Sequence, residues 1–289
     1  TPANTYTVTV SLFDERDRLL DEFEPIRFGF REFWIEGRDF LLNGSPIHLR
    51  ALHNTTINSR ADKSSLSGAL RTMERMQKYG FNFLITGNYN FSPGEVGYID
   101  GLLTAADRTG MLMSFSLPHT KDFNMKLDDP EQQARYEALT RWLIRRARNH
   151  PAVVLYAMNH NSTGYYGDQN PLKMDGRYQP EGHTDTLEYK GNPYRARARR
   201  QGTLAADIAK SLDPTRPVYH HQSGNLGDMH TVNIYLNWAP LQERDDWLNH
   251  WEASGAKPMF FVEWGLPHVS SWSSYRGPQF IWRYAAFQS

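Results

Sequence analysis

Residues 111–159 decide the fold, because they hold one complete strand–helix–strand unit. The unit reads MLMSFSLPH at 111–119, PEQQARYEALTRWLIRRARNH at 130–150 and PAVVLYAMN at 151–159. The first and last pieces are short apolar runs, and the middle piece has the length of a long helix. Short apolar strands joined by a helix are typical of βαβ units in a parallel sheet.

The same alternation continues on both sides of this unit. Seven strands in alternation, with no Gly-rich dinucleotide fingerprint after the first, favour an α/β fold of the (β/α)8 TIM-barrel class over a doubly wound sheet. An eighth strand is expected after Trp282, but the sequence shows no strand pattern there. Either this strand is short or the chain is truncated after strand seven. The other strands are predicted at residues 47–52, 81–88, 216–223, 229–238 and 257–265, and the other helices at residues 65–80, 97–110, 192–214 and 241–255.

The first 33 residues follow a different pattern. Thr5–Phe13 alternates with period two, and a polar turn and a second strand follow. Because one or two strands do not form a stable domain alone, residues 1–33 are predicted to be the last strands of a β-sandwich whose other strands lie outside the chain. Residues 34–289 are predicted to form the barrel. A hairpin should pair residues 34–35 with residues 40–42, with a turn at Asn43-Gly44.

The composition excludes several kinds of function. Lys plus Arg and Asp plus Glu both number 32, so no overall field attracts nucleic acid or an anionic membrane. There is no apolar run of about 18 residues that would span a membrane. The absence of cysteine excludes disulfides, thiolate metal sites and Cys nucleophiles. No histidine spacing supports a metal site, and no cofactor is expected.

The polar side chains expected at the strand ends form a short set, and Glu263 stands out among them. It follows four apolar residues in MFFVEWG, and a partly desolvated carboxylate must be paired or used in chemistry. The alternative is a structural brace, with Glu263 bonded to the backbone or to Arg50. Tyr235, one strand earlier, is placed to orient such a carboxylate and tune its basicity. The full set is Arg50, His53, Asn54, Thr86, Asn88, Tyr89, His119, Asn159, His160, Asn161, His220, His221, Gln222, Asn233, Tyr235, Asn237, Trp238, Glu263 and Trp264.

One long insert interrupts the alternation. Residues 161–194 are rich in Gly, Pro, Asn, Asp and Tyr and have neither helical nor strand periodicity. Loops of this length inside a compact domain are usually functional. This loop leaves the C-terminal end of a barrel strand, which is the catalytic face of such barrels.

Three stretches together resemble glycoside hydrolase family 2, which includes β-galactosidases, β-glucuronidases and β-mannosidases. FGFREFWIEGRDFLLNGSPIHLRALHN at 28–54 is similar to the junction between the immunoglobulin-like domain and the barrel. NHPAVVLYAMNHN at 149–161 is similar to the family's strand-four motif, and KPMFFVEWG at 257–265 to its nucleophile strand. The similarity covers most of the chain, from about Thr5 to Gly265.

The resemblance implies a retaining double displacement, in which one carboxylate attacks the anomeric carbon and a second carboxyl group protonates the leaving oxygen. Glu263 matches the nucleophile. Asn161 stands where the family has its acid/base Glu, and an amide has no catalytic proton to donate. His160 replaces the Asn that contacts the sugar 2-hydroxyl, and Asn88 replaces a His; Ile85 likewise replaces an Arg.

Three interpretations of Asn161 remain open. The favoured one is an active β-glycosidase with a relocated acid, for which Asp168 is the first candidate and Glu181 and His160 are the others. The second is a glycan-binding barrel that has lost catalysis, and the third is an engineered substitution. The catalytic set is therefore predicted as Glu263, Asn161 and Asp168, and the substrate-binding set as His53, Asn88, His119, His160, His221, Tyr235, Trp238 and Trp264.

The expected partner is a carbohydrate substrate. The rest of a larger multidomain chain is expected to be missing, and a secreted or periplasmic bacterial enzyme is favoured.

Overall fold

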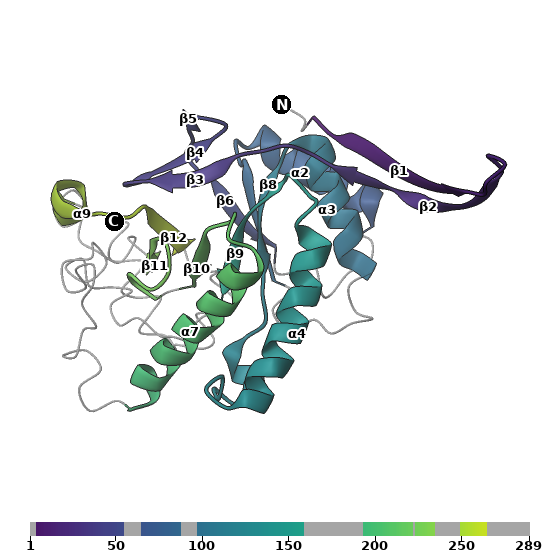
Figure 1. Cartoon of the computed structure of the whole chain (residues 1–289). Helices are drawn as coiled ribbons and strands as arrows, with labels where there is room; N and C mark the ends of the chain where they lie inside the picture. The colour runs from purple at the N-terminus through teal and green to yellow at the C-terminus, as the bar shows by residue number, and fades with distance from the viewer. Residues whose placement is uncertain are drawn as a thin grey trace.

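The computed structural model describes residues 4–54, 65–87, 97–158, 193–221, 223–234 and 249–264. Five parallel strands lie side by side in sequence order, and two further parallel strands form a second small sheet (Figure 1). The five are β6 (Ala51–Asn54), β7 (Phe83–Thr86), β8 (Leu112–Ser116), β9 (Val153–Met158) and β10 (Val218–His220), and the two are β11 (His230–Ile234) and β12 (Met259–Trp264). These are the seven alternating strands that the sequence predicts.

The helices run between successive strands, as βαβ connections require. They are α2 (Leu66–Lys78), α3 (Gly97–Thr109), α4 (Pro130–Ala147), α7 (Pro193–Leu212) and α9 (Asn249–Ser254). The starts of α2 and α4 follow from capping side chains. The Ser65 side chain accepts the Gly68 N–H at 3.2 Å. The side chain of Asp129, the residue before Pro130, accepts the N–H groups of Glu131 and Gln132. No helix in these ranges has the length and apolar character needed to cross a membrane.

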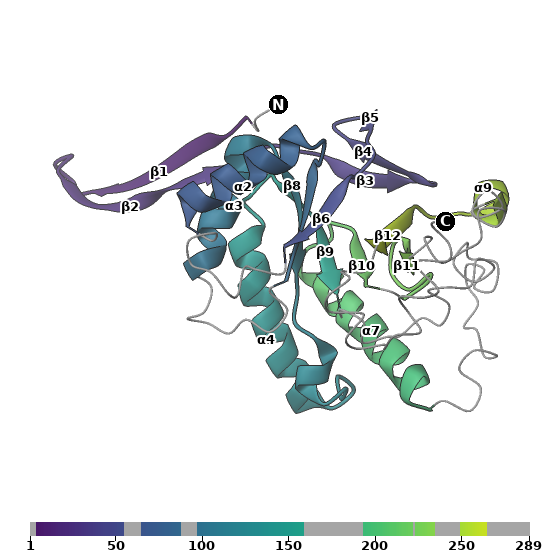
Figure 2. The same cartoon turned by 180° about the vertical axis from the view of Figure 1, so that it is seen from behind.

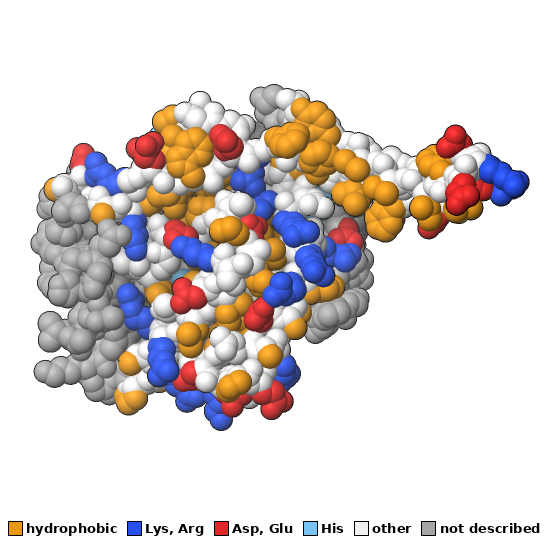
Figure 3. Space-filling view, viewed as in Figure 1, with side chains coloured by type: hydrophobic (Ala, Val, Ile, Leu, Met, Phe, Trp, Pro, Cys, Tyr) orange, Lys and Arg blue, Asp and Glu red, His pale blue; other side chains and the backbone are white. Residues whose placement is uncertain are grey.

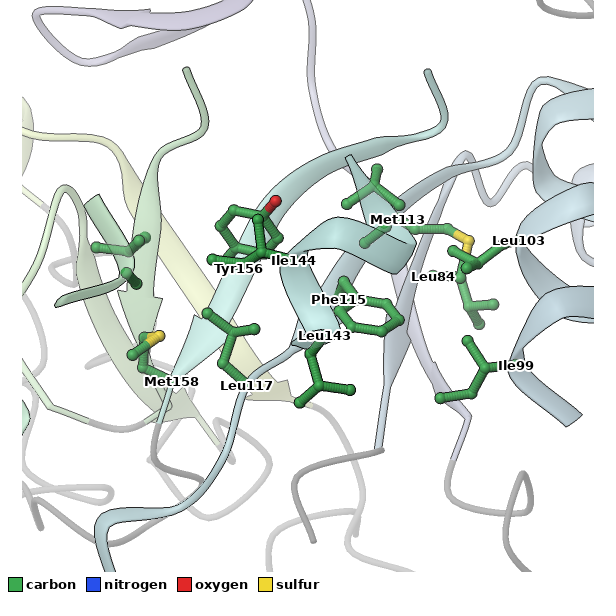
Figure 4. Close-up of a cluster of buried hydrophobic side chains, with 14 of the residues drawn as sticks. Leu84, Ile99, Leu103, Met113, Phe115, Leu117, Leu143, Ile144, Tyr156 and Met158 are labelled. Atoms are coloured by element: carbon green, nitrogen blue, oxygen red, sulfur yellow. The ribbon is translucent and has the colours of Figure 1, made fainter. Parts of the chain in front are cut away.

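Two apolar cores lie on the two faces of the strands. Between strands and helices, Leu84, Met113, Phe115 and Met158 pack against helix residues such as Leu143 (Figure 4). On the inner face, the rings of Tyr219 and Phe83 lie 5.0 and 6.0 Å from that of Phe260. Because both faces are covered, β7, β8 and β9 are buried throughout, as in barrels.

A small antiparallel sheet covers the N-terminal end of the barrel strands, where its Phe40 ring lies 6.4 Å from the ring of Phe260. The sheet is formed by β3 (Phe33–Glu36), β4 (Asp39–Leu42) and β5 (Ser45–Pro46). The predicted β3–β4 hairpin is present, but its turn was wrongly placed. The turn lies at Gly37-Arg38, whereas Asn43-Gly44, both at positive φ, joins β4 to β5.

The N-terminal strands β1 (Tyr6–Phe13) and β2 (Leu19–Phe28) form an antiparallel hairpin that projects from the rest of the molecule (Figures 1 and 2). Its apolar side chains are largely exposed, with Val10 at 58% and Phe23 at 62% (Figure 3). Both strands are where the alternation predicts them. That residues 1–33 belong to a separate β-sandwich stays a prediction, as does the domain boundary at residue 34.

The first barrel strand begins later than predicted. The expectation was a buried strand over Ile47–Leu52, but β6 spans Ala51–Asn54 and Leu52 is 44% exposed. The apolar residues before β6 are used elsewhere: Ile47 donates its N–H to the carbonyl of Phe40, and Ile47 and Leu49 pack on the inner core. Apolar character alone did not separate the covering sheet from the barrel strand.

We expect Gly29→Ala to lower the free energy of unfolding by about 1–3 kcal/mol, the usual cost of overpacking. A Cβ at this position would lie 2.7 Å from Cγ of Pro151 and 3.0 Å from the carbonyl oxygen of Asn4. Urea denaturation measures the loss. If the ring contact is the cause, the double variant Gly29→Ala/Pro151→Ala should regain part of it, and strictly additive losses would exclude this explanation.

Candidate active site

Two histidines from different strands flank the end of β9 at the mouth of the barrel. His119 follows β8 as the residue before the 3-10 helix η2 (Thr120–Phe123), and His221 follows β10 directly. The His221 N–H donates to the carbonyl of Met158, the last residue of β9, at 3.2 Å. C-terminal strand ends are where such barrels place their catalytic groups, so both residues lie on the face that the sequence predicts.

The His119 ring is a neutral group at the mouth. Burial, together with the charges of Lys121 and His221, lowers the pKa of His119 to about 4. A neutral imidazole has one N–H donor and one nitrogen acceptor, which suits hydroxyl groups that both donate and accept. His119 is therefore suited to binding a sugar hydroxyl.

His220 belongs to the opposite side of β10. It is fully buried, and burial together with the charges of Arg199 and Lys210 on α7 lowers its pKa to about 3. Neighbouring residues of a strand point to opposite faces, so only one of His220 and His221 can reach the barrel interior. The charges that act on His220 come from the helix side, which leaves His221 as the residue at the mouth.

We expect the free energy of unfolding to fall as the pH drops from about 6.5 toward 4. A histidine has a pKa of about 6.5 in the unfolded chain, so the unfolded state binds more protons than the folded state wherever the folded pKa is depressed. The contributions of His119 and His220 are therefore complete above about pH 6.5 and decline below it, by at most about 1.4 kcal/mol per pH unit for each residue.

Urea denaturation at several pH values measures this slope. His220→Gln should flatten it between pH 6.5 and 4, whereas His48→Gln at an exposed position should leave it as in the wild type. An unchanged slope in His220→Gln would show that His220 does not carry this pH dependence.

The backbone of Glu263 lies at the mouth end of β12, where it is the next-to-last residue. β11 pairs with β12 in parallel: Thr231 lies opposite Phe260, and Asn233 opposite Glu263. Two residues of β11 thus match three of β12, and this irregularity brings position 263 level with Asn233. Irregularities of this kind are frequent next to active sites, where they re-aim a side chain. Glu263 is also the one acidic residue in β6–β12.

Arg50 lies elsewhere than expected, and Thr86 lies at the end of β7 as expected but is used within the fold. Arg50 precedes β6 at the N-terminal end, where its Nε donates to the carbonyl of Gly80, so it does not belong to the mouth. This removes the brace between Arg50 and Glu263. Thr86 is fully buried, and its hydroxyl donates to the carbonyl of Ser114 at 3.1 Å and accepts the Ser116 N–H at 3.0 Å, so it holds two strands together.

A polar layer inside the barrel was missed by the sequence analysis. The Ser114 hydroxyl and the Tyr219 hydroxyl lie 3.0 Å apart, and both residues are buried. Ser114 and Ser116 alternate in MLMSFSL, and two small polar residues at period two in an apolar strand were the available signal.

The other predicted residues are described in part or lie outside the described ranges. For His53 in β6 and Trp264 in β12 the backbone position is described: each lies in the C-terminal half of its strand. The predicted residues outside the described ranges are Asn88, Tyr89, Asn159, His160, Asn161, Asp168, Glu181, Gln222, Tyr235, Asn237 and Trp238.

Comparisons with known proteins agree with this architecture. The model of the family described as "Glycosyl hydrolases family 2, TIM barrel domain" matches residues 31–289. A β-glucuronidase of Paenibacillus borealis is 24% identical over 93% of this chain and 43% of its own length. A β-galactosidase of Vibrio vulnificus is 24% identical over 87% of this chain and 27% of its own length.

Solved structures share the fold. A β-glucuronidase of Parabacteroides merdae superposes with a TM-score of 0.62 at 20% identity, over 91% of this chain and 29% of that protein. A β-galacturonidase of Eisenbergiella tayi gives a TM-score of 0.61 at 20% identity, over 90% of this chain and 43% of that protein. The chain thus spans less than half the length of these relatives. With a family match over most of its residues, the chain belongs to glycosyl hydrolase family 2 and carries that family's TIM-barrel domain.

Proposed function

We propose that this chain is the catalytic barrel of a β-glycoside hydrolase that works by retaining double displacement, with Glu263 as the nucleophile. The observation that carries the proposal is the position of Glu263. It is the one acidic residue in the seven parallel strands β6–β12, and the irregular pairing of β11 with β12 brings it level with Asn233 at the mouth. Family membership supports the same reaction.

In the first step, the Glu263 carboxylate attacks the anomeric carbon while the bond to the leaving oxygen breaks. A glycosyl ester forms, and a proton donor protonates the departing oxygen. In the second step, the same group takes a proton from water as the water attacks the anomeric carbon, which frees the sugar and regenerates Glu263. The β-configuration is retained because each step inverts it.

His119 and His221 are proposed to bind sugar hydroxyls beside the end of β9. The support is that they follow β8 and β10, the two strands that pair with β9, and that the His119 ring is neutral at pH 7. His53, Asn88, His160, Tyr235, Trp238 and Trp264 complete the proposed binding set.

The substrate class is proposed from the relatives. Their names include β-glucuronidase, β-galacturonidase and β-galactosidase, so the sugar is expected to be a β-linked uronic acid or a β-linked galactoside. The test is a screen of 4-nitrophenyl β-D-glucuronide, β-D-galacturonide, β-D-galactoside and β-D-mannoside. Release of nitrophenolate by the wild type but not by Glu263→Gln supports the proposal, and no release from any substrate contradicts it.

The second candidate is a glycan-binding barrel without catalysis, and Asn161 is the observation that favours it. This function predicts sugar binding without turnover. Calorimetric titration with the free sugars separates the two, because binding that is equally tight in the wild type and Glu263→Gln, with no hydrolysis, identifies a binding protein.

If Asp168 is the relocated acid, Asp168→Asn should lose far more activity on substrates with poor leaving groups than on activated ones. A phenol that carries nitro groups leaves without protonation, whereas a sugar alcohol needs a proton. The expected difference in kcat/KM losses is about 100-fold, at the lower end of general acid contributions. Glu181→Gln and His160→Asn provide matched comparisons for the other candidates. Equal losses on both substrates would remove Asp168 from the role.

A further inference from the structure

Residues 29–32 connect the projecting hairpin to the sheet that covers the barrel (Figure 1). We name these four residues the linker. A short segment that begins with a glycine is ordinarily a candidate hinge, because a few loop residues can absorb a large change of direction. In this protein, however, each of the four residues is held by neighbouring parts of the chain.

Gly29 serves close packing and not flexibility. A Cβ at this position would lie 2.7 Å from Cγ of Pro151 and 3.0 Å from the carbonyl oxygen of Asn4. The linker backbone thus lies directly against the turn that enters β9 and against the residues just before β1. Because these atoms are so close, the glycine has little room to change its direction.

The hairpin end of the linker is held by ring contacts. The ring of Phe30 lies 5.4 Å from that of Tyr6 on β1 and 5.5 Å from that of Phe28 on β2, in edge-to-face arrangements. Tyr6 and Phe28 are also directly paired across the two strands. The linker is therefore a continuation of the base of the hairpin.

The other end of the linker is fixed through its backbone. The Glu32 N–H donates to Oδ1 of Asn43, and the Glu32 carbonyl accepts the Asn43 N–H, both at 2.9 Å. Asn43 lies in the turn between β4 and β5 at a φ of 50°, a conformation that few side chains adopt. Rotation of the chain at Glu32 would break both hydrogen bonds.

Arg31 attaches the middle of the linker to the start of β9. Its Nε donates to the carbonyl of Pro151 at 2.8 Å, and its Nη2 donates to the carbonyl of Val153. Arg216 also donates to the Val153 carbonyl, from Nε at 2.8 Å, so this acceptor is fixed independently of Arg31. A planar guanidinium that binds two fixed carbonyl groups is restricted to one orientation.

The burial of Arg31 favours a single arrangement of the linker. Burial, together with the charge of Arg216, lowers the pKa of Arg31 to about 9, so the guanidinium still carries its charge at pH 7. Both carbonyl contacts are then charge-assisted and stronger than bonds between neutral groups. A buried cation is stabilised only when its hydrogen bonds are well formed, which a moving linker would not allow.

We propose that the linker is a rigid coupling, locked by Arg31, that holds the hairpin at one angle to the barrel. β9 is a firm base for it, because this strand is buried along its whole length and pairs with β8 and β10. The apolar side chains of the hairpin, such as Val10 and Phe23, are exposed, so whatever packs on them is held at the same angle (Figure 3). This inference does not rest on the proposed function, and its test needs no substrate.

Spin labels measure this angle, and the chain is suited to them because it has no native cysteine. Glu15→Cys in the hairpin turn and Gln133→Cys on α4 place one label on each side of the linker, both at exposed positions. Double electron–electron resonance in frozen solution gives the distribution of distances between the labels. A rigid coupling predicts one narrow peak, and adding Arg31→Ala should widen it roughly two-fold or more, because the released linker becomes a hinge. A distribution that is already broad before Arg31 is changed would overturn the proposal, as would one that Arg31→Ala leaves unchanged.

A second label pair separates motion at the linker from bending of the hairpin. Glu15→Cys and Arg27→Cys both lie within the hairpin, at exposed positions, and Arg31→Ala should leave the distance distribution between them unchanged. Equal widening in both pairs would show that the hairpin itself had lost its structure, and would remove the locking role from Arg31. Arg31→Lys keeps the charge but loses the forked geometry, so it should give an intermediate width, and it serves if Arg31→Ala does not fold.

Arg146→Ala is the matched control. The Arg146 guanidinium binds the carboxylate of Asp100 and lies over the ring of Trp142, so its contacts are with the outer helices. This variant should leave the distributions of both label pairs unchanged. The same widening in Arg146→Ala as in Arg31→Ala would contradict a specific role of Arg31 and point to general loosening of the fold.

Discussion

Glu263→Gln should lower kcat on an aryl β-glycoside by roughly 10⁴-fold or more, which corresponds to about 5–6 kcal/mol of transition-state stabilisation. The amide has nearly the same shape as the carboxylate but is a very weak nucleophile, so the glycosyl ester does not form. Fold and stability should be close to those of the wild type, since the substitution preserves volume. Steady-state kinetics and a melting curve measured on the same sample check both statements.

A second variant distinguishes a nucleophile from a brace. Glu263→Ala leaves space beside the anomeric carbon, and added azide should then attack from that side and restore turnover of a 2,4-dinitrophenyl β-glycoside. The product should be the α-glycosyl azide, because a single displacement inverts the β-configuration. Asn233→Ala, at the position opposite Glu263 in the strand pairing, is the matched comparison and should show no azide rescue. Failure of rescue in Glu263→Ala, with the fold intact, would argue against a nucleophilic role.

The alternation of apolar runs and helices was enough to predict the barrel, because each run had to be buried on both faces. β7, β8 and β9 are buried throughout, as such runs require. The first strand was less well predicted. Apolar residues from Ile47 onward belong partly to the covering of the barrel and partly to β6, and apolarity does not distinguish these two uses.

The site was only partly predictable, for a physical reason. Sequence shows which residue types follow a strand, but not where the strand starts and ends. Arg50 was placed at the mouth because β6 was predicted to begin too early. Thr86 does end its strand, but the sequence did not show that its hydroxyl bonds to β8. The irregular pairing that brings Glu263 level with Asn233 depends on the partner strand, which no local pattern reveals.

Asp213→Ala should destabilise the fold by about 3–5 kcal/mol, the usual result of removing one partner from a buried ion pair. Asp213 accepts hydrogen bonds at 2.7 Å from both Arg216 and the Tyr156 hydroxyl, and all but 6% of the residue is buried. Although burial alone raises the pKa of Asp213, the hydrogen bond from Thr215 and the charge of Arg216 bring it below its usual value. The residue is therefore an anion at neutral pH, and without it Arg216 stays buried near Arg31 with no carboxylate of its own.

The comparison that tests this account is an ion pair of the same chemistry on the surface. Arg141 and Glu137 lie one turn apart on α4, with side chains 47% and 42% exposed, and Arg141→Ala should cost less than about 1 kcal/mol. Urea denaturation at pH 7 gives both values. The double variant Asp213→Ala/Arg216→Leu should be more stable than Asp213→Ala alone, because it no longer buries an uncompensated cation. A double variant that is less stable than Asp213→Ala would show instead that the contacts of Arg216 with the Val153 and Arg148 carbonyls dominate, and would make β9 anchoring the main role of this arginine.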